Sequence, residues 1–128
     1  MMNGFLLVAL GGALGAAARY GVGLAVTQHG GVEGNWATLL VNVTGSAVMG
    51  GLVAWLSTRG ALGDQALWLF FGVGLLGAFT TYSSFSKDTV DLIIAGEVTG
   101  ALAYVAANTV LSIGAFAITL VSVRGLFA

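Results

Sequence analysis

The chain has 128 residues, of which 58% are hydrophobic and only 7% are charged, where a soluble domain carries about 25% charged residues. With a mean hydropathy of +1.00, this composition predicts an integral, multi-pass protein of the cell membrane, with the lipid bilayer as its solvent. The absence of cysteine excludes disulfides and thiolate metal sites, and a net charge of −1 without basic runs argues against a nucleic-acid partner.

Four apolar stretches are long enough to cross the membrane. About 30 Å of hydrocarbon requires roughly 20 helical residues. The stretches predict helices over residues 4–27, 36–56, 66–94 and 98–123, so residues 1–128 form a single all-α transmembrane domain. The first stretch has no basic segment before it and is predicted to be a span, not a cleaved signal peptide. The polar connections at 29–34, 57–65 and 95–97 are too short to hold a further domain.

The first span contains closely spaced glycines and one charged residue. Gly11 and Gly15 are four residues apart, and Gly96 and Gly100 repeat this spacing near the fourth span, which favours close helix packing. Arg19 has no acidic neighbour in the sequence. Because a charged side chain in a span faces protein or water, Arg19 is either an electropositive vestibule group that attracts anions or an anchor that reaches the membrane surface.

The second and fourth spans each carry a polar stripe. Residues at i, i+4 and i+8 share one helical face; they are Thr38, Asn42 and Ser46 in the second span and Tyr104, Asn108 and Ser112 in the fourth. An amide offers two donors to a passing anion, but it can equally tie two helices together at about 1 kcal/mol. Together the stripes could line a path.

The third span has an apolar first half and a hydroxyl-rich second half. Five serines and threonines lie within residues 80–86, shortly after Gly77. Such residues compete for backbone hydrogen bonds and glycine lowers helix propensity, so the pattern predicts a break near the middle of the span, with the first half-helix ending near Gly77. Broken backbone at this depth is buried in protein or lines a wet cavity, and transporters use it for ion sites. The alternative is an unbroken helix whose hydroxyls bond to carbonyls one turn earlier.

Charges at the span ends give little information about orientation. Arg59 and Arg124 would lie on one side of the membrane and Arg19 and Lys87 on the other, which is compatible with insertion both ways. Lys87, together with Asp88 and Asp91, is interpreted as the wet end of the third span. The sequence shows no catalytic triad, phosphate loop or ligand cluster, so no enzymatic activity is expected.

Three segments, Gly11–Tyr20, Asn42–Ser46 and Gly77–Ser86, together resemble the Fluc (CrcB) family of fluoride channels. The resemblance implies a passive, fluoride-selective channel that exports fluoride. It also implies an antiparallel, dual-topology homodimer with two pores and a structural sodium ion at its centre. The sodium-binding carbonyls fall on Gly77 and Thr80, and the vestibule arginine falls on Arg19.

The fluoride path combines this resemblance with the polar stripes. The pore asparagine falls on Asn42, the pair of pore phenylalanines on Tyr82 and Phe85, and the hydroxyl track on residues of the third and fourth spans. The complete set of expected path residues is Thr38, Asn42, Tyr82, Ser83, Ser84, Phe85, Tyr104, Asn108 and Ser112.

Four positions depart from the family pattern: Tyr82 stands where Phe is usual, Ser84 where Thr is usual, Asp88 where Glu is usual, and Asn108 where a hydroxyl is more common. The first departure matters most, because a phenol presents a hydroxyl where the family offers a bare ring edge.

Two other functions compete with a fluoride channel. A small dual-topology exporter of cations or drugs shares the four spans, but it needs an acidic residue in its first span, and this span has Arg19 and no Asp or Glu. A non-transporting assembly subunit would leave the polar stripes and the hydroxyl-rich segment unexplained.

Overall fold

The computed structural model describes residues 2–30, 34–58 and 65–127. The elements are α1 (Met2–Gly30), α2 (Gly34–Thr58), α3 (Gln65–Leu67), the π-helix η2 (Trp68–Leu76), α4 (Gly77–Phe79), α5 (Tyr82–Ile94) and α6 (Val98–Phe127). Within these described residues, four stretches are long and apolar enough to cross a membrane: Asn3–Gln28, Asn35–Thr58, Gln65–Ile94 and Val98–Leu126. The all-helical architecture with four candidate spans is confirmed.

The helices extend a few residues beyond the predicted spans. In lipid every backbone polar group needs a partner within the protein, and an α-helix provides one for each residue. The chain has no proline to end a helix early; α1 continues to Gly30, so His29, expected in a loop, lies in its last turn. The predictions for Arg59 and for most of the two longer connections lie outside the described residues.

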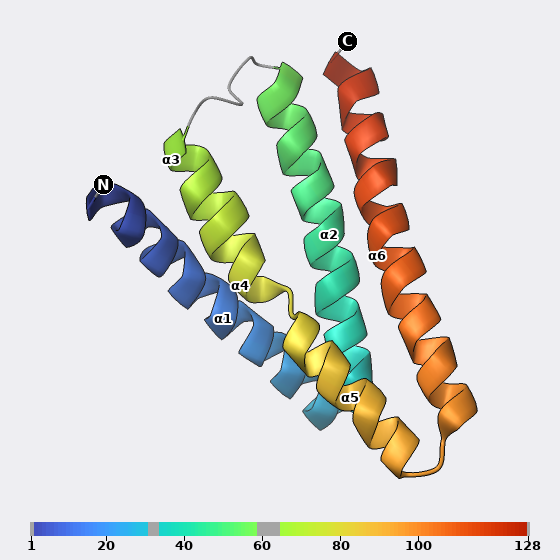
Figure 1. Cartoon of the computed structure of the whole chain (residues 1–128). Helices are drawn as coiled ribbons and strands as arrows, with labels where there is room; N and C mark the ends of the chain where they lie inside the picture. The colour runs from blue at the N-terminus through green and yellow to red at the C-terminus, as the bar shows by residue number, and fades with distance from the viewer. Residues whose placement is uncertain (1, 31–33, 59–64, 128) are drawn as a thin grey trace.

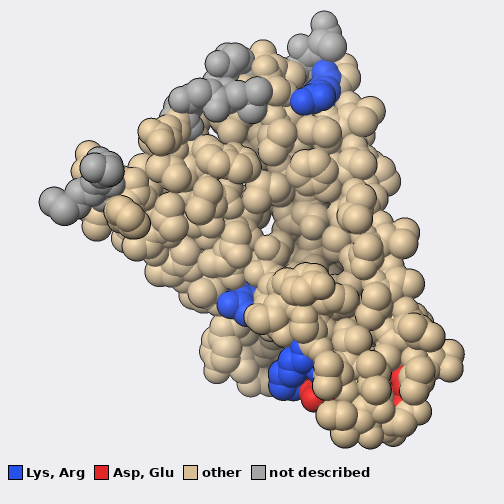
Figure 2. Space-filling view, in the orientation of Figure 1, with Lys and Arg blue, Asp and Glu red and all other residues tan. Residues whose placement is uncertain are grey.

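The helices form two pairs, α1 with η2 and α2 with α6 (Figure 1). Both chain termini lie at the upper end of the view, and α5 lies at the lower end, where it contacts α2 and α6. In the space-filling view the charged groups gather in the lower part and at one upper edge (Figure 2). The broad uncharged face between them is what contact with lipid requires. The same view shows a hollow between the two helix pairs.

Glycines allow the backbones of α1 and η2 to touch. A Cβ atom at Gly15 would collide with the carbonyl oxygen of Leu75, and one at Gly11 would collide with that of Phe70. In the other pair, a Cβ at Gly50 would collide with the Phe116 carbonyl. Small residues at these crossings permit the close helix contact that drives association in lipid.

Gly96 has a different role from the packing role that its spacing indicated. It has a φ of +83° and ends α5. Its N–H donates to the Ile93 carbonyl at 3.0 Å, and the N–H of Glu97 donates to the Leu92 carbonyl at 2.9 Å. These two bonds form a Schellman motif, for which glycine at the left-handed position is the usual residue.

The third span is broken near its middle, at Thr80–Thr81, a few residues after Gly77. Gly77 is helical, with φ −62° and ψ −34°, and α4 ends at Phe79. Thr80 (φ −79°, ψ 158°) and Thr81 (φ −151°, ψ 118°) are extended. The break falls on the hydroxyl residues because the side chain of Thr81 caps α5: its Oγ1 accepts the N–H of Ser84 at 3.1 Å.

Candidate functional site

The side chain of Asn42 bridges the break in the third span. Its Oδ1 accepts the backbone N–H of Thr81 at 2.8 Å, and its Nδ2 donates to the carbonyl of the same residue at 3.1 Å. Nδ2 also donates to Asn108 Oδ1 at 3.1 Å. The amide of Asn42 thus takes the place of the helical hydrogen-bond partners of Thr81. It also links α2 to both α5 and α6.

The carbonyls of Gly77 and Thr80 are among those that lose their helical partners at the break. In an unbroken helix the N–H of Thr81 would donate to the Gly77 carbonyl, but here it donates to Asn42. The N–H of Ser84 would donate to the Thr80 carbonyl, but here it donates to Thr81 Oγ1. Gly77 and Thr80 are the two residues to which the sequence resemblance assigned sodium.

Arg19 lies beside the end of the first half-span. Its Nε donates to the carbonyl of Ala78 at 3.1 Å, in a part-buried contact. A cation is favourable there, since the C-terminal end of a helix carries partial negative charge. Arg19 also lines a groove of about 280 Å³ together with Thr38, Thr81 and Ser84. The side chain therefore contacts protein at the break, which differs from an anchor that reaches only the membrane surface.

A second groove, of about 330 Å³, lies on the other side of the break. It brings together five of the predicted path residues, which are Asn42, Tyr82, Phe85, Asn108 and Ser112. Thr81 lines both grooves, so the break separates them. Within the part of the chain that the structure describes, the buried Oγ of Ser112 has no hydrogen-bond partner, which leaves a hydroxyl available beside this groove.

Three aromatic rings lie next to one another, and two of them, Tyr82 and Phe85, line the second groove. The Phe85 ring centroid is 5.3 Å from that of Tyr82 and 5.7 Å from that of Tyr104, and both pairs are tilted. Tyr82 itself is 80% exposed. The edge of an aromatic ring carries partial positive charge, so Phe85 gives the groove that it lines a weakly positive group without a fixed charge.

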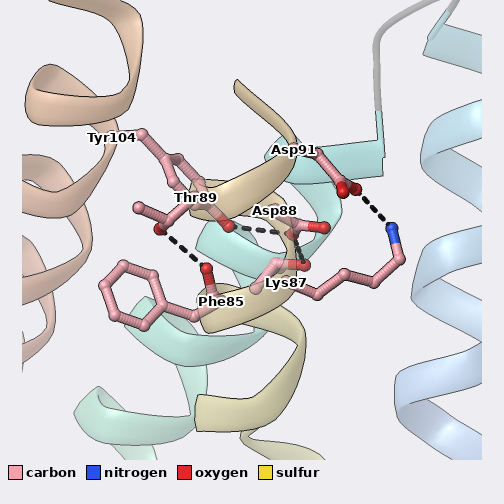
Figure 3. Close-up of polar contacts among 7 residues, drawn as sticks. Phe85, Lys87, Asp88, Thr89, Asp91 and Tyr104 are labelled. Atoms are coloured by element: carbon pink, nitrogen blue, oxygen red, sulfur yellow. Dashed lines mark hydrogen bonds and ion pairs between the residues drawn. The ribbon is translucent and has the colours of Figure 1, made fainter. Parts of the chain in front are cut away.

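Asp88 is the residue whose role the sequence did not indicate. Its Oδ2 accepts hydrogen bonds from the hydroxyls of Thr38 at 2.7 Å and Tyr104 at 3.0 Å. Figure 3 shows the Tyr104 hydroxyl pointing at the Asp88 carboxylate, while Lys87 extends away toward Asp91. Asp88 therefore joins α2, α5 and α6, whereas the exposed pair of Lys87 and Asp91, 2.6 Å apart, fits the predicted wet end.

The remaining path residues occupy less central places. Ser83 is exposed and its Oγ lies 3.2 Å from Thr81 Oγ1, and Ser84 Oγ accepts from Thr81 Oγ1 at 3.1 Å. Thr80, by contrast, bonds back to the Leu76 carbonyl at 3.0 Å, as the unbroken-helix alternative expected of such hydroxyls. After the break, Ser86 Oγ donates to the Tyr82 carbonyl at 2.9 Å, so the hydroxyl-rich segment combines capping at the break with local back-bonding on both sides of it.

The fold and these contacts define a small multi-pass membrane protein with a broken span between two polar grooves. Residues 6–120 match the family model described as "CrcB-like protein, Camphor Resistance (CrcB)", and the chain belongs to this family. It is 42% identical over 127 residues to a protein of Hyphomonas neptunium named "Fluoride-specific ion channel FluC", an alignment that covers 99% of this chain and 100% of the relative.

Other relatives carry the same name. The protein of Paracoccus denitrificans is 48% identical over 129 residues and covers 100% of both chains. That of Thermus thermophilus is 50% identical over 103 residues, which are 80% of this chain and 81% of the relative. Family membership confirms the resemblance that the three sequence segments indicated.

Proposed function

We propose that this chain is a passive, fluoride-selective channel of the cell membrane. The observation that carries the proposal is the groove in which Asn42, Phe85 and Asn108 lie beside the extended residues of the third span, in a chain whose relatives are named fluoride-specific channels. A channel is a transport protein and requires no catalytic residues.

The chemistry of the groove suits a small, strongly hydrated anion. Such an ion crosses only where the protein replaces the donors of water at short range, which hydroxyls, amide N–H groups and ring edges can do without fixed charge. Weak sites in succession let the ion leave as well as enter. Arg19 lines the other groove, where its charge attracts anions without holding one in the narrow part of the path.

The test of this function is ion efflux from liposomes that contain the purified chain. A fluoride electrode should record rapid efflux down the fluoride gradient, without a requirement for a proton or cation gradient. Liposomes loaded with chloride should release little of it. Equal release of both anions would contradict fluoride selectivity, and proton-coupled export of a cation would indicate the exporter, which the absence of an acidic residue in the first span disfavours.

The functional unit that we propose is an antiparallel homodimer with two pores. Both grooves lie open on the surface of one chain, and many large apolar side chains are exposed, among them Leu14, Ile94 and Ile118. A second copy in the opposite orientation would cover part of this surface and wall the grooves. The chain would then contribute half of each pore wall.

Dual topology leads to a direct expectation. The positive charges predicted at the span ends are balanced, with Arg59 and Arg124 on one side and Arg19 and Lys87 on the other, so the positive-inside rule favours neither orientation. A reporter fused to the C-terminus should therefore be found on both the cytoplasmic and the external side of the membrane. A protein that places its C-terminus only on one side cannot form the antiparallel dimer.

We further propose that the carbonyls of Gly77 and Thr80 hold a structural sodium ion on the dimer axis. Their helical N–H partners donate elsewhere, and bare carbonyl oxygens without a carboxylate suit a hard monovalent cation. When bound, the ion would neutralise partial negative charge from the ends of two half-spans and connect the subunits. It is not transported.

A further inference from the structure

The amide of Asn42 has all its hydrogen-bonding groups engaged within one chain. A neutral amide has two N–H donors and one carbonyl oxygen. The oxygen accepts from Thr81 N–H, one N–H group donates to the Thr81 carbonyl, and the other donates to Asn108 Oδ1. The third partner is a side chain on α6, which is only 5% exposed.

We propose that Asn108 is a positioning residue. It holds the Asn42 amide on the Thr81 peptide and so maintains the extended backbone that breaks the third span. In the opposite orientation the Asn42 amide would turn its NH₂ group toward the N–H of Thr81, and two donors would face each other. The oxygen of Asn108 selects the productive orientation, because it accepts only from Nδ2. Asn108 is fixed in turn, since its own Nδ2 donates to the Tyr104 carbonyl at 3.4 Å.

The consequence concerns the backbone of the break. Without the Asn42 oxygen, the N–H of Thr81 has no partner, and an unpaired donor is costly in a membrane interior. The nearest replacement in an ordinary helix is the Gly77 carbonyl, four residues earlier. The extended Thr81 cannot reach that carbonyl without a change of its own backbone conformation, so its N–H would lack a partner and would be open to hydrogen exchange. A contact between α6 and α2 thereby controls the shape of the third span.

This inference deepens the proposed channel function, and its test has a readout that does not depend on transport. The test is hydrogen exchange of the Thr81 backbone amide in the purified, fluoride-free protein. Asn108→Leu, which has similar size but no acceptor, should exchange about tenfold faster at Thr81 than the wild type, a factor equivalent to ~1.4 kcal/mol. Asn42→Leu should change the exchange at Thr81 at least as much. The double variant should match Asn42→Leu alone, because Asn108 acts only through Asn42.

A conservative variant separates positioning from lining the groove. Asn108→Asp keeps an oxygen that accepts from Asn42 Nδ2, so the protection of the Thr81 amide should be retained. It also places a carboxylate in the groove, so fluoride efflux should fall. Thr44→Val is the matched control, because Thr44 is an exposed residue of α2 whose hydroxyl bonds only to the Leu40 carbonyl at 2.6 Å; exchange and efflux should both stay at wild-type values.

Three results would overturn the proposal: unchanged Thr81 exchange in Asn108→Leu, an additional effect of Asn108→Leu in the Asn42→Leu background, or loss of protection in Asn108→Asp. If Asn108→Leu does not fold, Asn108→Ala, which also has no side-chain acceptor, should give faster exchange in its place. Wild-type protein that fails to release fluoride while Asn108→Leu still loses protection would contradict the channel function and leave the positioning role intact.

Discussion

Replacing Phe85 by isoleucine is expected to abolish fluoride efflux and to leave the chain folded. The Phe85 ring lies between the rings of Tyr82 and Tyr104 and lines the second groove. Isoleucine keeps an apolar side chain in that place but has no positive ring edge to offer an anion. Each aromatic pair contributes only about 0.5–1.5 kcal/mol beyond its buried area, so the helices should still assemble.

A change at Asn42 tests the same path through charge. Asn42→Asp keeps an oxygen that can accept the Thr81 N–H, but it adds a negative charge beside the passing anion. Two like charges 4 Å apart repel by roughly 4 kcal/mol at an effective dielectric constant of about 20, which corresponds to roughly a thousandfold loss of flux. The variant also turns oxygen atoms toward the Thr81 carbonyl and Asn108, so Thr81 exchange should be measured in parallel.

Both variants are to be compared in liposomes with the wild type and with Thr44→Val, and size exclusion should show that each keeps the wild-type assembly state. Efflux of nearly wild-type speed from Phe85→Ile and Asn42→Asp would remove both residues from the path. Loss of efflux in Thr44→Val as well would show that any change in α2 disturbs transport, and the result at Asn42 would then carry no information on the pore.

The fold could be predicted because composition and length decide it. Four apolar stretches without proline, in a solvent that demands internally satisfied backbone groups, leave little besides four helices. The hydroxyl-rich segment also indicated a break correctly, since threonines and serines stabilise non-helical backbone. The extended residues follow Gly77 by three to four positions, because Gly77 itself has a regular helical conformation and the first half-span continues to Phe79.

Part of the site could also be predicted. The stripe containing Asn42 and the stripe containing Asn108 meet in one groove beside Phe85, as residues on facing sides of packed helices should. The sequence did not indicate whether such polar groups bind an ion or each other. The structure gives Asn42 both partners within the chain, so the same residue ties helices together and lines the groove.

Other features depend on contacts distant in sequence. The π-helical segment Trp68–Leu76 has no signature beyond its apolar residues; it packs against α1, where Gly11 and Gly15 admit its backbone. Asp88 looked like an ordinary charge at a span end. It accepts a hydrogen bond from Thr38, which is fifty positions away in the sequence, and only the fold brings the two residues together. A pattern of spacing along one helix contains no information of this kind.

The second large effect concerns the proposed sodium ion. Its physical basis is that some backbone carbonyls at the break lose their hydrogen-bond donors. The Ala78 carbonyl accepts from Arg19, and the Leu76 carbonyl accepts from Thr80 N–H at 3.1 Å. The carbonyls of Gly77 and Thr80 lose their helical donors to Asn42 and to Thr81 Oγ1. In the proposed antiparallel dimer the same two carbonyls of a second copy would face them. Four oxygens at bilayer depth without donors would be costly, and one cation removes that cost.

Replacing sodium by choline in the buffer is therefore expected to weaken the dimer, measured as a lower unfolding temperature and a larger monomer fraction. At a sodium concentration about 100 times the dissociation constant, the lost stabilisation is roughly 2.7 kcal/mol.

Gly77→Ala should remove most of this sodium dependence, because a methyl group would crowd an ion on the axis. Within one chain the added Cβ meets only the Gly72 carbonyl oxygen, at 3.5 Å, so the fold itself should tolerate it. Gly125→Ala, where a Cβ meets nothing within 4 Å, should keep the full sodium dependence. A wild-type dimer equally stable in choline and in sodium would refute the sodium site and leave the fluoride path untouched.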